Sequence, residues 1–553
     1  MTELLRAELP LALRDESTSA GHDPMSGTAA DDLAVRRWRL AQFVLGAFAL
    51  AVGILILDAS PVGVAIDDAM YVILAKSLAT GQGYRFLNLP GAPAGTHYPP
   101  GYPALLALLW RIAPDFPANL MLFKAVNALW LAVTAVAVAR FARARLLPTP
   151  WALATGAVTA VSAPLLVLGA LLMSEPFFLA LLIPLLAWTE RFVDEPAALG
   201  AAGIRRPVLL GIAIGAALLI RTHAIALLPA IALLLAMRRR WRDAAIVCGV
   251  AIVCLLPWQV WSARHAADIP AALRGEYGSY LGWWMRGFRE MGPSMVPMTL
   301  RRTFAETGSM FAVLFSPLRG ETAHLVTLIS LAAVVAVGIA ARWRRMPVTL
   351  LFTGIYLSII ALWPFPSSRF VWSIWPLILL VLFSGGHRIQ LWVRDGRLAA
   401  PRRALAMAAA VAVVWIAAGY VAYETRAARG RWWLSIPREN TARIVPAVRW
   451  TLANTAPTDI IATDDEGAIF LYTGRRTVPV RSFTVRQYLT TIPVEADVRE
   501  GLIPILAAYP VRTVVVGSVA SLQQAEWLAA QPRPLVARRE VFPEGAAFTV
   551  LGP

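Results

Sequence analysis

The chain has 553 residues, of which 58% are hydrophobic and only 15% are charged. This apolar content is far above what the core of a soluble protein needs, so an ordinary soluble enzyme is excluded and a polytopic helical membrane protein is predicted. The net charge of +17 comes mostly from arginine clusters between apolar runs. Such clusters are typical of cytoplasmic loops, so we attribute the charge to membrane topology and expect no nucleic-acid partner.

Residues 1–37 are polar and contain no basic segment leading into a cleavable apolar run, so we expect a disordered cytoplasmic tail. Eleven apolar runs of helical length follow, and we expect each to cross the membrane. They lie near Leu40–Leu57, Leu120–Ala139, Trp151–Met173, Phe177–Trp188, Val208–Ile220, Ala224–Met237, Ala244–Trp261, Leu325–Ala340, Val348–Trp363, Phe370–Phe383 and Leu405–Tyr420.

Arginine clusters precede the first run and follow every second run, which places the N-terminus in the cytoplasm. The segment Pro207–Met237 has such clusters at both ends, and as one helix it would be roughly 46 Å long, against a hydrocarbon core of about 30 Å. The chain must therefore turn back at Arg221-Thr222-His223. We expect a membrane domain over residues 38–423 with outer loops at 60–119 and 262–322, located in the cell's inner (plasma) membrane.

The remainder of the chain, residues 436–553, has evenly spread charges and apolar runs of strand length. Strands are predicted at 460–462 and 513–516, and helices at Ala442–Asn454 and Ser521–Ala530, so we expect a small extracytoplasmic α/β domain. We expect the acidic run Asp464–Glu466 to cap the helix that follows it. Recognition of an acceptor molecule is the function that we assign to this domain.

Several isolated charged residues fall on the predicted outer face. Asp67 and Asp68 precede a segment with the pattern of an amphipathic interfacial helix, and Asp67 can be read as its N-cap with Asp68 favoured by the helix dipole. Glu175 follows Ser174 at a helix start and has the same ordinary interpretation. Arg221, His223 and Arg369 are harder to explain in this way, because cations are unusual on outer hairpins. Acids and cations on one face also suit a site where a carboxylate takes a proton from a hydroxyl and arginines hold a phosphate.

The second outer loop is rich in aromatic residues. Tyr277, Tyr280, Trp283, Trp284 and Phe288 lie close together with two arginines. They suit either an interfacial helix that orders over a substrate or an aromatic belt at the headgroup level, and we favour the belt.

Several segments of the membrane part resemble the GT-C fold, the polyprenyl-phosphate-sugar-dependent glycosyltransferases, which include protein O-mannosyltransferases, lipid A aminoarabinose transferases and mycobacterial arabinosyltransferases. The resemblance is carried by Asp67–Tyr71 with Leu74–Gly81, His97–Pro103, Ser174–Pro176, Leu219–Arg221, and Ser368–Phe370 with Trp375–Leu377. It covers most of the membrane part, with these segments in the family's order.

The resemblance implies a catalytic role for Asp67, as the general base that activates the acceptor hydroxyl, and less securely for Asp68, at a position that is often Glu. It implies that Glu175 lies near the acceptor or a metal ion. It places Arg221 and Arg369 near the donor phosphate. Among the residues that position the substrate we count His97, Tyr98, His223 and Tyr71. Whether a divalent cation takes part is left open.

The implied reaction moves a sugar from a polyprenyl-phosphate donor to a hydroxyl of a glycan, lipid or protein acceptor. A single displacement predicts inversion of configuration, with the carboxylate and the arginines on opposite sides of the sugar. One alternative is a transporter or flippase of lipid-linked sugars, for which polar groups near the midplane and an inverted repeat are expected. Another is a non-catalytic subunit that assembles envelope proteins through its outer domain.

Overall fold

The computed structural model describes residues 24–196, 200, 202–395, 398–481 and 483–551. Most of the expected tail 1–37 lies outside the described residues. The chain divides into a short N-terminal unit ending at Val44 and a second unit, Leu45–Pro553, which holds every site discussed below.

Eight helices within the described residues are long and apolar enough to cross a membrane. They are α1 (Pro24–Leu55), α4 (Leu120–Arg145), α7 (Glu175–Asp194), α8 (Ala202–Ile220), α10 (Trp241–Arg264), α14 (Glu321–Arg342), α17 (Trp375–Arg394) and α18 (Ala400–Gly430). A ninth is obtained if α5 (Thr149–Val161) and α6 (Ala163–Ala170), which are bent by 46° at their junction, form one broken span. The prediction of a polytopic helical membrane protein is confirmed.

The expected count of eleven spans is higher than the eight or nine found. The other two predicted spans correspond to shorter apolar helices, α9 (Leu227–Met237) with the 3₁₀ turn Thr222–Ala226 before it, and α15 (Pro347–Ala361). At 15 residues, α15 is only about 22 Å long, against a hydrocarbon core of about 30 Å. Apolar composition therefore located these two helices, but it did not show that they are too short to count as full spans.

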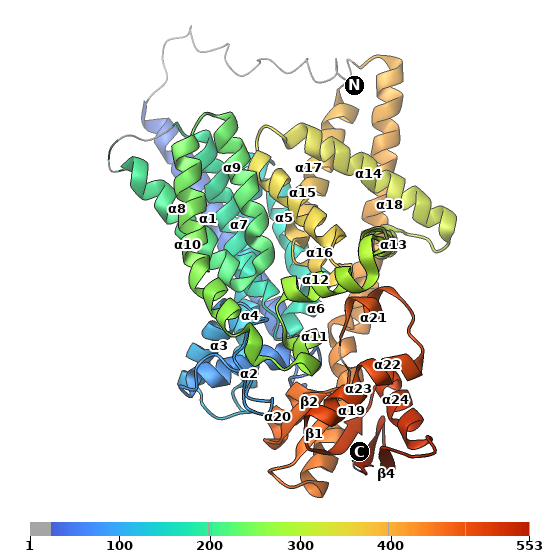
Figure 1. The fold of residues 1–553 in the computed structure, drawn as a ribbon. Coiled ribbons are helices and arrows are strands. Elements are labelled where there is room, and N and C mark those ends of the chain that lie inside the picture. The colour runs from blue at the N-terminus through green and yellow to red at the C-terminus, as the bar shows by residue number, and fades with distance from the viewer. Residues whose placement is uncertain (1–23, 197–199, 201, 396–397, 482, 552–553) are drawn as a thin grey trace. The chain divides into compact units, whose positions relative to one another are not determined.

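Five short helices and the 21-residue α13 lie toward the end of the membrane helices that carries the C-terminal domain (Figure 1). They are α2 (Asp67–Ala79), α3 (Gly101–Ile112), α11 (Arg274–Tyr277), α12 (Tyr280–Met291), α13 (Met295–Phe315) and α16 (Ser367–Trp372). The predicted amphipathic character of α2 is wrong, because every residue from Asp68 to Ala75 is buried. This helix packs against α3 and the C-terminal domain and forms part of the core.

The C-terminal domain is the predicted α/β domain. Its five-stranded sheet has the order β2-β1-β3-β5-β4, in which β2, β1 and β3 are parallel and the other two pairings are antiparallel. The strands are β1 (Ile460–Thr463), β2 (Arg476–Pro479), β3 (Val511–Val516), β4 (Val536–Phe542) and β5 (Gly545–Val550). The helices are α19 (Ser435–Asn454), α20 (Glu466–Thr473), α21 (Val485–Leu489), α22 (Val494–Glu500), α23 (Leu502–Ala508) and α24 (Val519–Ala529).

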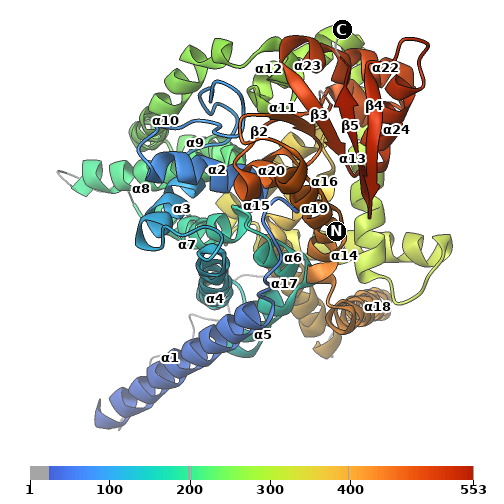
Figure 2. The same cartoon turned by 90° about the horizontal axis from the view of Figure 1, so that it is seen from below.

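The C-terminal domain and the first outer loop share one hydrophobic core. Phe86 of the loop and Phe548 of β5 are fully buried and belong to the same cluster. The backbone N–H of Thr477 in β2 also donates to the carbonyl of Asn88, 2.8 Å away. In Figure 2, β2 and α20 lie directly beside α2. The sheet therefore supports the loop that carries Asp67.

Candidate active site

The N-terminus of α7 places a carboxylate in the protein interior. Glu175 is the first residue of this helix, followed by the proline that favours a helix start, and its side chain is fully buried. Ser174 is the N-cap residue, as the sequence suggested, but its side chain makes no capping hydrogen bond. Its hydroxyl instead accepts a hydrogen bond from Nη1 of Arg221 at 3.0 Å and lies 3.2 Å from the hydroxyl of Tyr71.

Two arginines neutralise Glu175. Nη1 of Arg221 lies 2.9 Å from its Oε1, and Nε of Arg369 lies 2.7 Å from the same oxygen. Arg221 has an extended backbone at the break between α8 and the following 3₁₀ turn, whereas Arg369 belongs to α16. A buried carboxylate costs several kcal/mol to desolvate, so it is stable only with such partners.

Arg369 also contacts Asp67. Its Nη1 lies 2.5 Å from Oδ2 of Asp67, whose Oδ1 accepts a 2.6 Å hydrogen bond from the hydroxyl of Tyr98. The side chains of Asp67 and Arg369 are 23% and 28% exposed, in contrast to Glu175. The network therefore has a buried part, Glu175 and Arg221, and a part that solvent reaches, Asp67 and Arg369.

Arg369 and Asp67 form a direct ion pair, which is a favourable arrangement of opposite charges. The expected placement of Asp67 and the arginines on opposite sides of the donor sugar stays a prediction.

The two histidines lie at the edges of this network. Nδ1 of His97 is 2.6 Å from the carbonyl of Gly278, and its ring packs on Tyr98 and Tyr280. Burial lowers the pKa of His97, which favours the neutral ring. His223 packs against Phe370, with ring centres 5.2 Å apart, and against two further aromatic rings.

Asp68 is not joined to the arginines. Its buried carboxylate accepts hydrogen bonds from the backbone N–H groups of Gly63, Ala65 and Ala69 at 2.9–3.1 Å. Burial raises the pKa of Asp68 despite these bonds. Asp67, in turn, does not cap α2, because that helix has no side-chain cap and its N-cap residue is Ile66. Asp68 thus organises the loop, and Asp67 is left to face Arg369.

The aromatic belt is a wrong interpretation for part of the second outer loop. Tyr277 is fully buried, and its hydroxyl accepts from Nδ2 of Asn88 at 2.9 Å and donates to Glu466 at 3.1 Å. Trp283 is buried as well and donates to the carbonyl of Phe483. Sequence reasoning also missed the contact of Tyr280 with His97, with ring centres 4.0 Å apart. Aromatic composition alone could not separate lipid contacts from contacts with the C-terminal domain.

A metal ion does not fit these donors. Both carboxylates that reach the network are already paired with guanidinium groups. Within the described ranges, no group of three or more His, Cys, Asp or Glu side chains is arranged to hold a metal ion. No step of the reaction proposed below runs through one.

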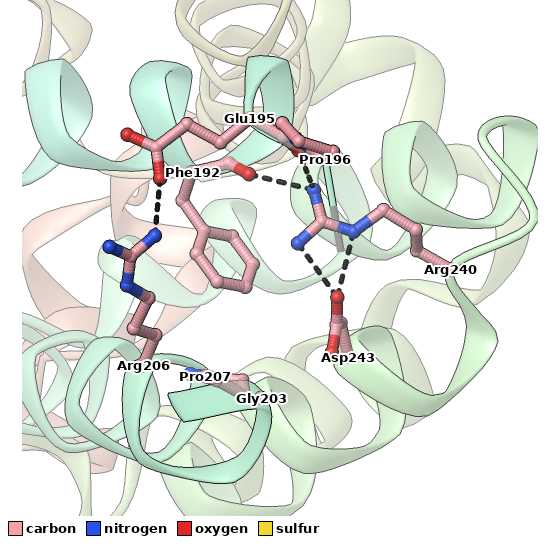
Figure 3. A pocket seen from close by; sticks show the side chains of 8 residues that line it. All are labelled: Phe192, Glu195, Pro196, Gly203, Arg206, Pro207, Arg240 and Asp243. Carbon is pink, nitrogen blue, oxygen red and sulfur yellow. Dashed lines mark hydrogen bonds and ion pairs between the residues drawn. The ribbon is translucent and has the colours of Figure 1, made fainter. Parts of the chain in front are cut away.

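A pocket at the other end of α7 is lined by ion pairs (Figure 3). Arg240 lies 2.7 Å from Asp243, and Arg206 lies 2.8 Å from Glu195. The helix has 20 residues, so this pocket is about 30 Å from Glu175 along its axis. It is not part of the candidate site.

Long apolar helices, a charged network at one end and an α/β domain beside it define a multi-pass membrane protein with the GT-C fold. The structure is similar to ArnT from Cupriavidus metallidurans bound to undecaprenyl phosphate, with a TM-score of 0.54 and 13% sequence identity over 92% of this chain and 97% of that one. The apo form of that protein gives a TM-score of 0.52 at 14% identity over 93% and 98% of the two chains.

A second similar structure is the Archaeoglobus fulgidus oligosaccharyltransferase in complex with Zn and sulfate. Its TM-score is 0.51 at 14% identity, over 86% of this chain and 68% of that one. No protein-family model and no curated protein matches the sequence. At these identities the similarity establishes the fold.

Proposed function

We propose that the protein is an inverting glycosyltransferase that moves a sugar from a polyprenyl-phosphate donor to a hydroxyl group of a cell-envelope glycan, glycolipid or protein. The fold supports this proposal, because one similar protein, ArnT, binds undecaprenyl phosphate and another is named an oligosaccharyltransferase. The observation that carries it is the partly exposed Asp67–Arg369 pair, backed by Glu175 and Arg221.

The arginines are suited to hold the donor phosphate. Arg369 shares its guanidinium between Asp67 and Glu175, so a phosphate that approaches from solvent competes with Asp67 for Nη1. Guanidinium groups bind phosphate through strong charge-assisted hydrogen bonds. Arg221 adds positive charge from the buried part of the network, and ion pairs with Glu175 hold both arginines in position.

Donor binding frees Asp67 to act as the base. Once Arg369 has turned to the phosphate, the sugar lies between the two groups and the carboxylate faces the acceptor hydroxyl. The hydroxyl oxygen forms a bond to the anomeric carbon, its proton passes to Asp67, and the bond from that carbon to the phosphate oxygen breaks. Polyprenyl phosphate leaves with the electron pair, stabilised by the arginines. Attack opposite the leaving group inverts the configuration.

The arginines at the other end of the helices support the proposed orientation. Arg145 and Arg238 both contact Asp194 at the C-terminus of α7. Clusters of this kind favour the cytoplasmic side, so the site at the N-terminus of α7 lies on the extracytoplasmic side. Donors there must be lipid-linked, because nucleotide sugars are cytoplasmic. The C-terminal domain lies on the same side.

The proposal is tested by comparing envelope glycans from cells that lack the protein with glycans from cells that carry the wild type or Asp67→Asn. We expect a sugar residue to be missing by mass spectrometry without the protein, to return with the wild type and to stay missing with Asp67→Asn. Full restoration by Asp67→Asn at normal membrane levels would remove the proposed base from the mechanism.

A further inference from the structure

The loop that precedes Asp67 has a strained backbone and depends on outside contacts. Gly63 and Ile66 both have positive φ, 104° and 62°, and a β-branched residue such as Ile66 is rarely found there. Strain of this kind costs on the order of 1–3 kcal/mol and persists only where the surroundings impose it. Because Ile66 directly precedes Asp67, the direction in which the Asp67 carboxylate points depends on this loop.

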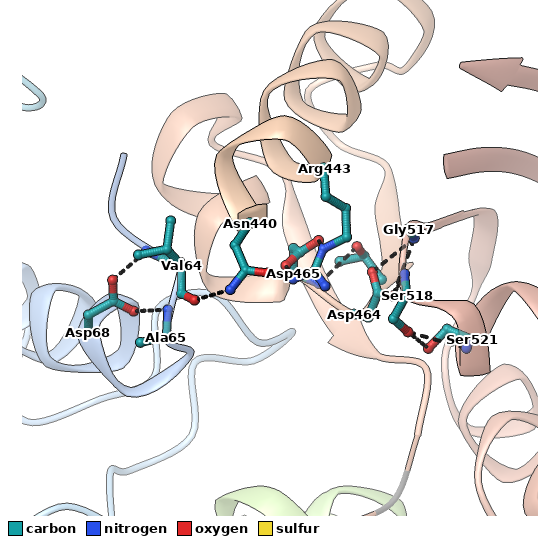
Figure 4. A network of polar contacts seen from close by, with 12 residues as sticks. Val64, Ala65, Asp68, Asn440, Arg443, Asp464, Asp465, Gly517, Ser518 and Ser521 are labelled. Carbon is teal, nitrogen blue, oxygen red and sulfur yellow. Dashed lines mark hydrogen bonds and ion pairs between the residues drawn. The ribbon is translucent and has the colours of Figure 1, made fainter. Parts of the chain in front are cut away.

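The C-terminal domain supplies part of that support. Nδ2 of Asn440, in α19, donates to the carbonyl of Val64 at 2.6 Å. The hydroxyl of Tyr472, in α20, accepts from the backbone N–H of Val62 at 3.0 Å. Asp68 holds the same loop from the other side, through Gly63 and Ala65 (Figure 4).

The helix that carries Asn440, α19, is joined to the sheet by an ion pair. One helical turn further along α19, Arg443 makes two hydrogen bonds to Asp465, at 2.6 and 3.0 Å. The neighbouring Asp464 accepts from the backbone N–H of Ser518 at 2.7 Å. Asp465 is the N-cap residue of α20, but the predicted side-chain capping is wrong, because no side chain makes a capping hydrogen bond there. The two aspartates tie α19 to the sheet, as Figure 4 shows.

The topology of the sheet explains why the loop docks here. Strand β1 lies between β2 and β3, and the chain leaves the carboxyl ends of β1 and β3 in opposite directions. In open α/β sheets, ligands bind at such a switch point. In this protein the Arg443–Asp465 pair occupies the switch point between β1 and β3, beside the loop that precedes Asp67. The loop approaches α20 closely, since a Cβ on Gly63 would lie 2.5 Å from Cβ of Ala468.

We propose that the C-terminal domain orients the catalytic loop and that Asn440 is a positioning residue for Asp67, through its hydrogen bond to Val64. This inference rests on the proposed function, because it assumes that Asp67 is the base. Asn440 touches no reacting atom. Its loss lets the loop relax, and a displacement of about 1 Å at a reacting group can cost on the order of a hundredfold in rate.

The test compares Asn440→Ala with Asn454→Ala, which removes a similar side-chain-to-backbone bond, to Trp450, at the far end of the same helix. The substrates are polyprenyl-phosphate-linked sugars and acceptor glycans extracted from the producing cells, and released polyprenyl monophosphate is measured. For Asn440→Ala we expect kcat to fall roughly ten- to a hundredfold, while KM for the donor stays within about twofold. Asn454→Ala should match the wild type.

Hydrogen exchange gives a second readout that does not depend on activity. We expect faster exchange in the peptide covering residues 62–69 of Asn440→Ala, with α24 unchanged. If Asn440→Ala does not fold, Asn440→Asp keeps the side-chain volume but places an acceptor against the Val64 carbonyl, and it should show the same pattern.

Unchanged kcat, unchanged exchange, or equal effects from both asparagines would overturn the inference. Asp67→Asn separates this failure from failure of the proposed function. If Asp67→Asn abolishes transfer and Asn440→Ala does not reduce it, only the positioning role is lost. If Asp67→Asn transfers sugar normally, the proposed base fails, and the positioning role fails with it.

Discussion

The guanidinium of Arg369 lies 2.5 Å from the carboxylate of Asp67, and the same side chain reaches Glu175 at 2.7 Å. One arginine thus links the proposed base to the buried acid. While this pair is closed, Asp67 is engaged and Arg369 has less capacity for a phosphate. In the proposed reaction, donor binding opens the pair, which couples phosphate recognition to release of the base.

Substitution of Arg369 by Lys should weaken donor binding. Lysine keeps the charge but cannot hold Glu175 and a phosphate with separate N–H groups, so the donor complex loses at least one charge-assisted bond, worth about 1.5–3 kcal/mol. We expect the dissociation constant for undecaprenyl monophosphate in detergent to rise roughly 10- to 100-fold. Arg301→Lys, an exposed substitution on α13, is the control. Equal affinity of both variants for this lipid would argue against phosphate binding by Arg369.

Removal of the Glu175 charge should destabilise the protein, because it leaves Arg221 buried without its acid. Breaking a buried ion pair costs about 3–5 kcal/mol, whereas replacing the whole pair by apolar groups is often neutral. We therefore expect Glu175→Gln to lower Tm in detergent clearly, and Glu175→Gln combined with Arg221→Met to recover part of the loss. Additive losses in the double variant would contradict the pairing.

Stability should fall below neutral pH because of His97. Burial lowers the pKa of His97 below the usual 6.5, so the unfolded chain binds more protons than the folded one in that range. The contribution of His97 to the free energy of unfolding is fully present above pH 6.5 and is lost as the pH falls below that value. His97→Asn retains a donor for the Gly278 carbonyl, and its Tm should decrease less between pH 7 and pH 5 than that of the wild type. An equal decrease in Tm for both proteins between these pH values would contradict the prediction.

The buried hydroxyl of Tyr277 should contribute to docking of the second outer loop. Tyr277→Phe removes one hydrogen bond to Asn88 and one to Glu466, which costs on the order of 1–3 kcal/mol in the free energy of unfolding. The control is Tyr509→Phe, because the Tyr509 hydroxyl is buried with no hydrogen-bond partner among the described residues. We expect a lower Tm for Tyr277→Phe and almost no change for Tyr509→Phe. Equal Tm values would mean that the Tyr277 hydroxyl does not stabilise the fold.

Much of the fold was readable from the sequence because burial in lipid restricts composition strongly. Apolar runs gave the helical membrane class, and short alternations of strands and helices gave the α/β domain. Charges such as Arg221 and Arg369 stood out because isolated cations near a membrane are costly. The structure brings both to Glu175.

Other features depend on contacts that no local pattern records. Asp67 and Asp68 are neighbours, yet one faces Arg369 and the other holds the loop, since successive helix residues point in different directions. The bond from Asn440 to Val64 joins residues 376 positions apart. Burial of Tyr277 likewise depends on a domain that comes later in the chain.

The most direct test of the central claim is release of polyprenyl monophosphate by the purified protein in detergent, from extracted lipid-linked sugars and envelope acceptors. The account predicts release by the wild type and by Asp115→Asn, an exposed carboxylate in the same outer loop, and a rate reduced at least about a hundredfold in Asp67→Asn. A transporter would release no polyprenyl phosphate in detergent. Absence of release from the wild type, or wild-type rates in Asp67→Asn, would contradict the account.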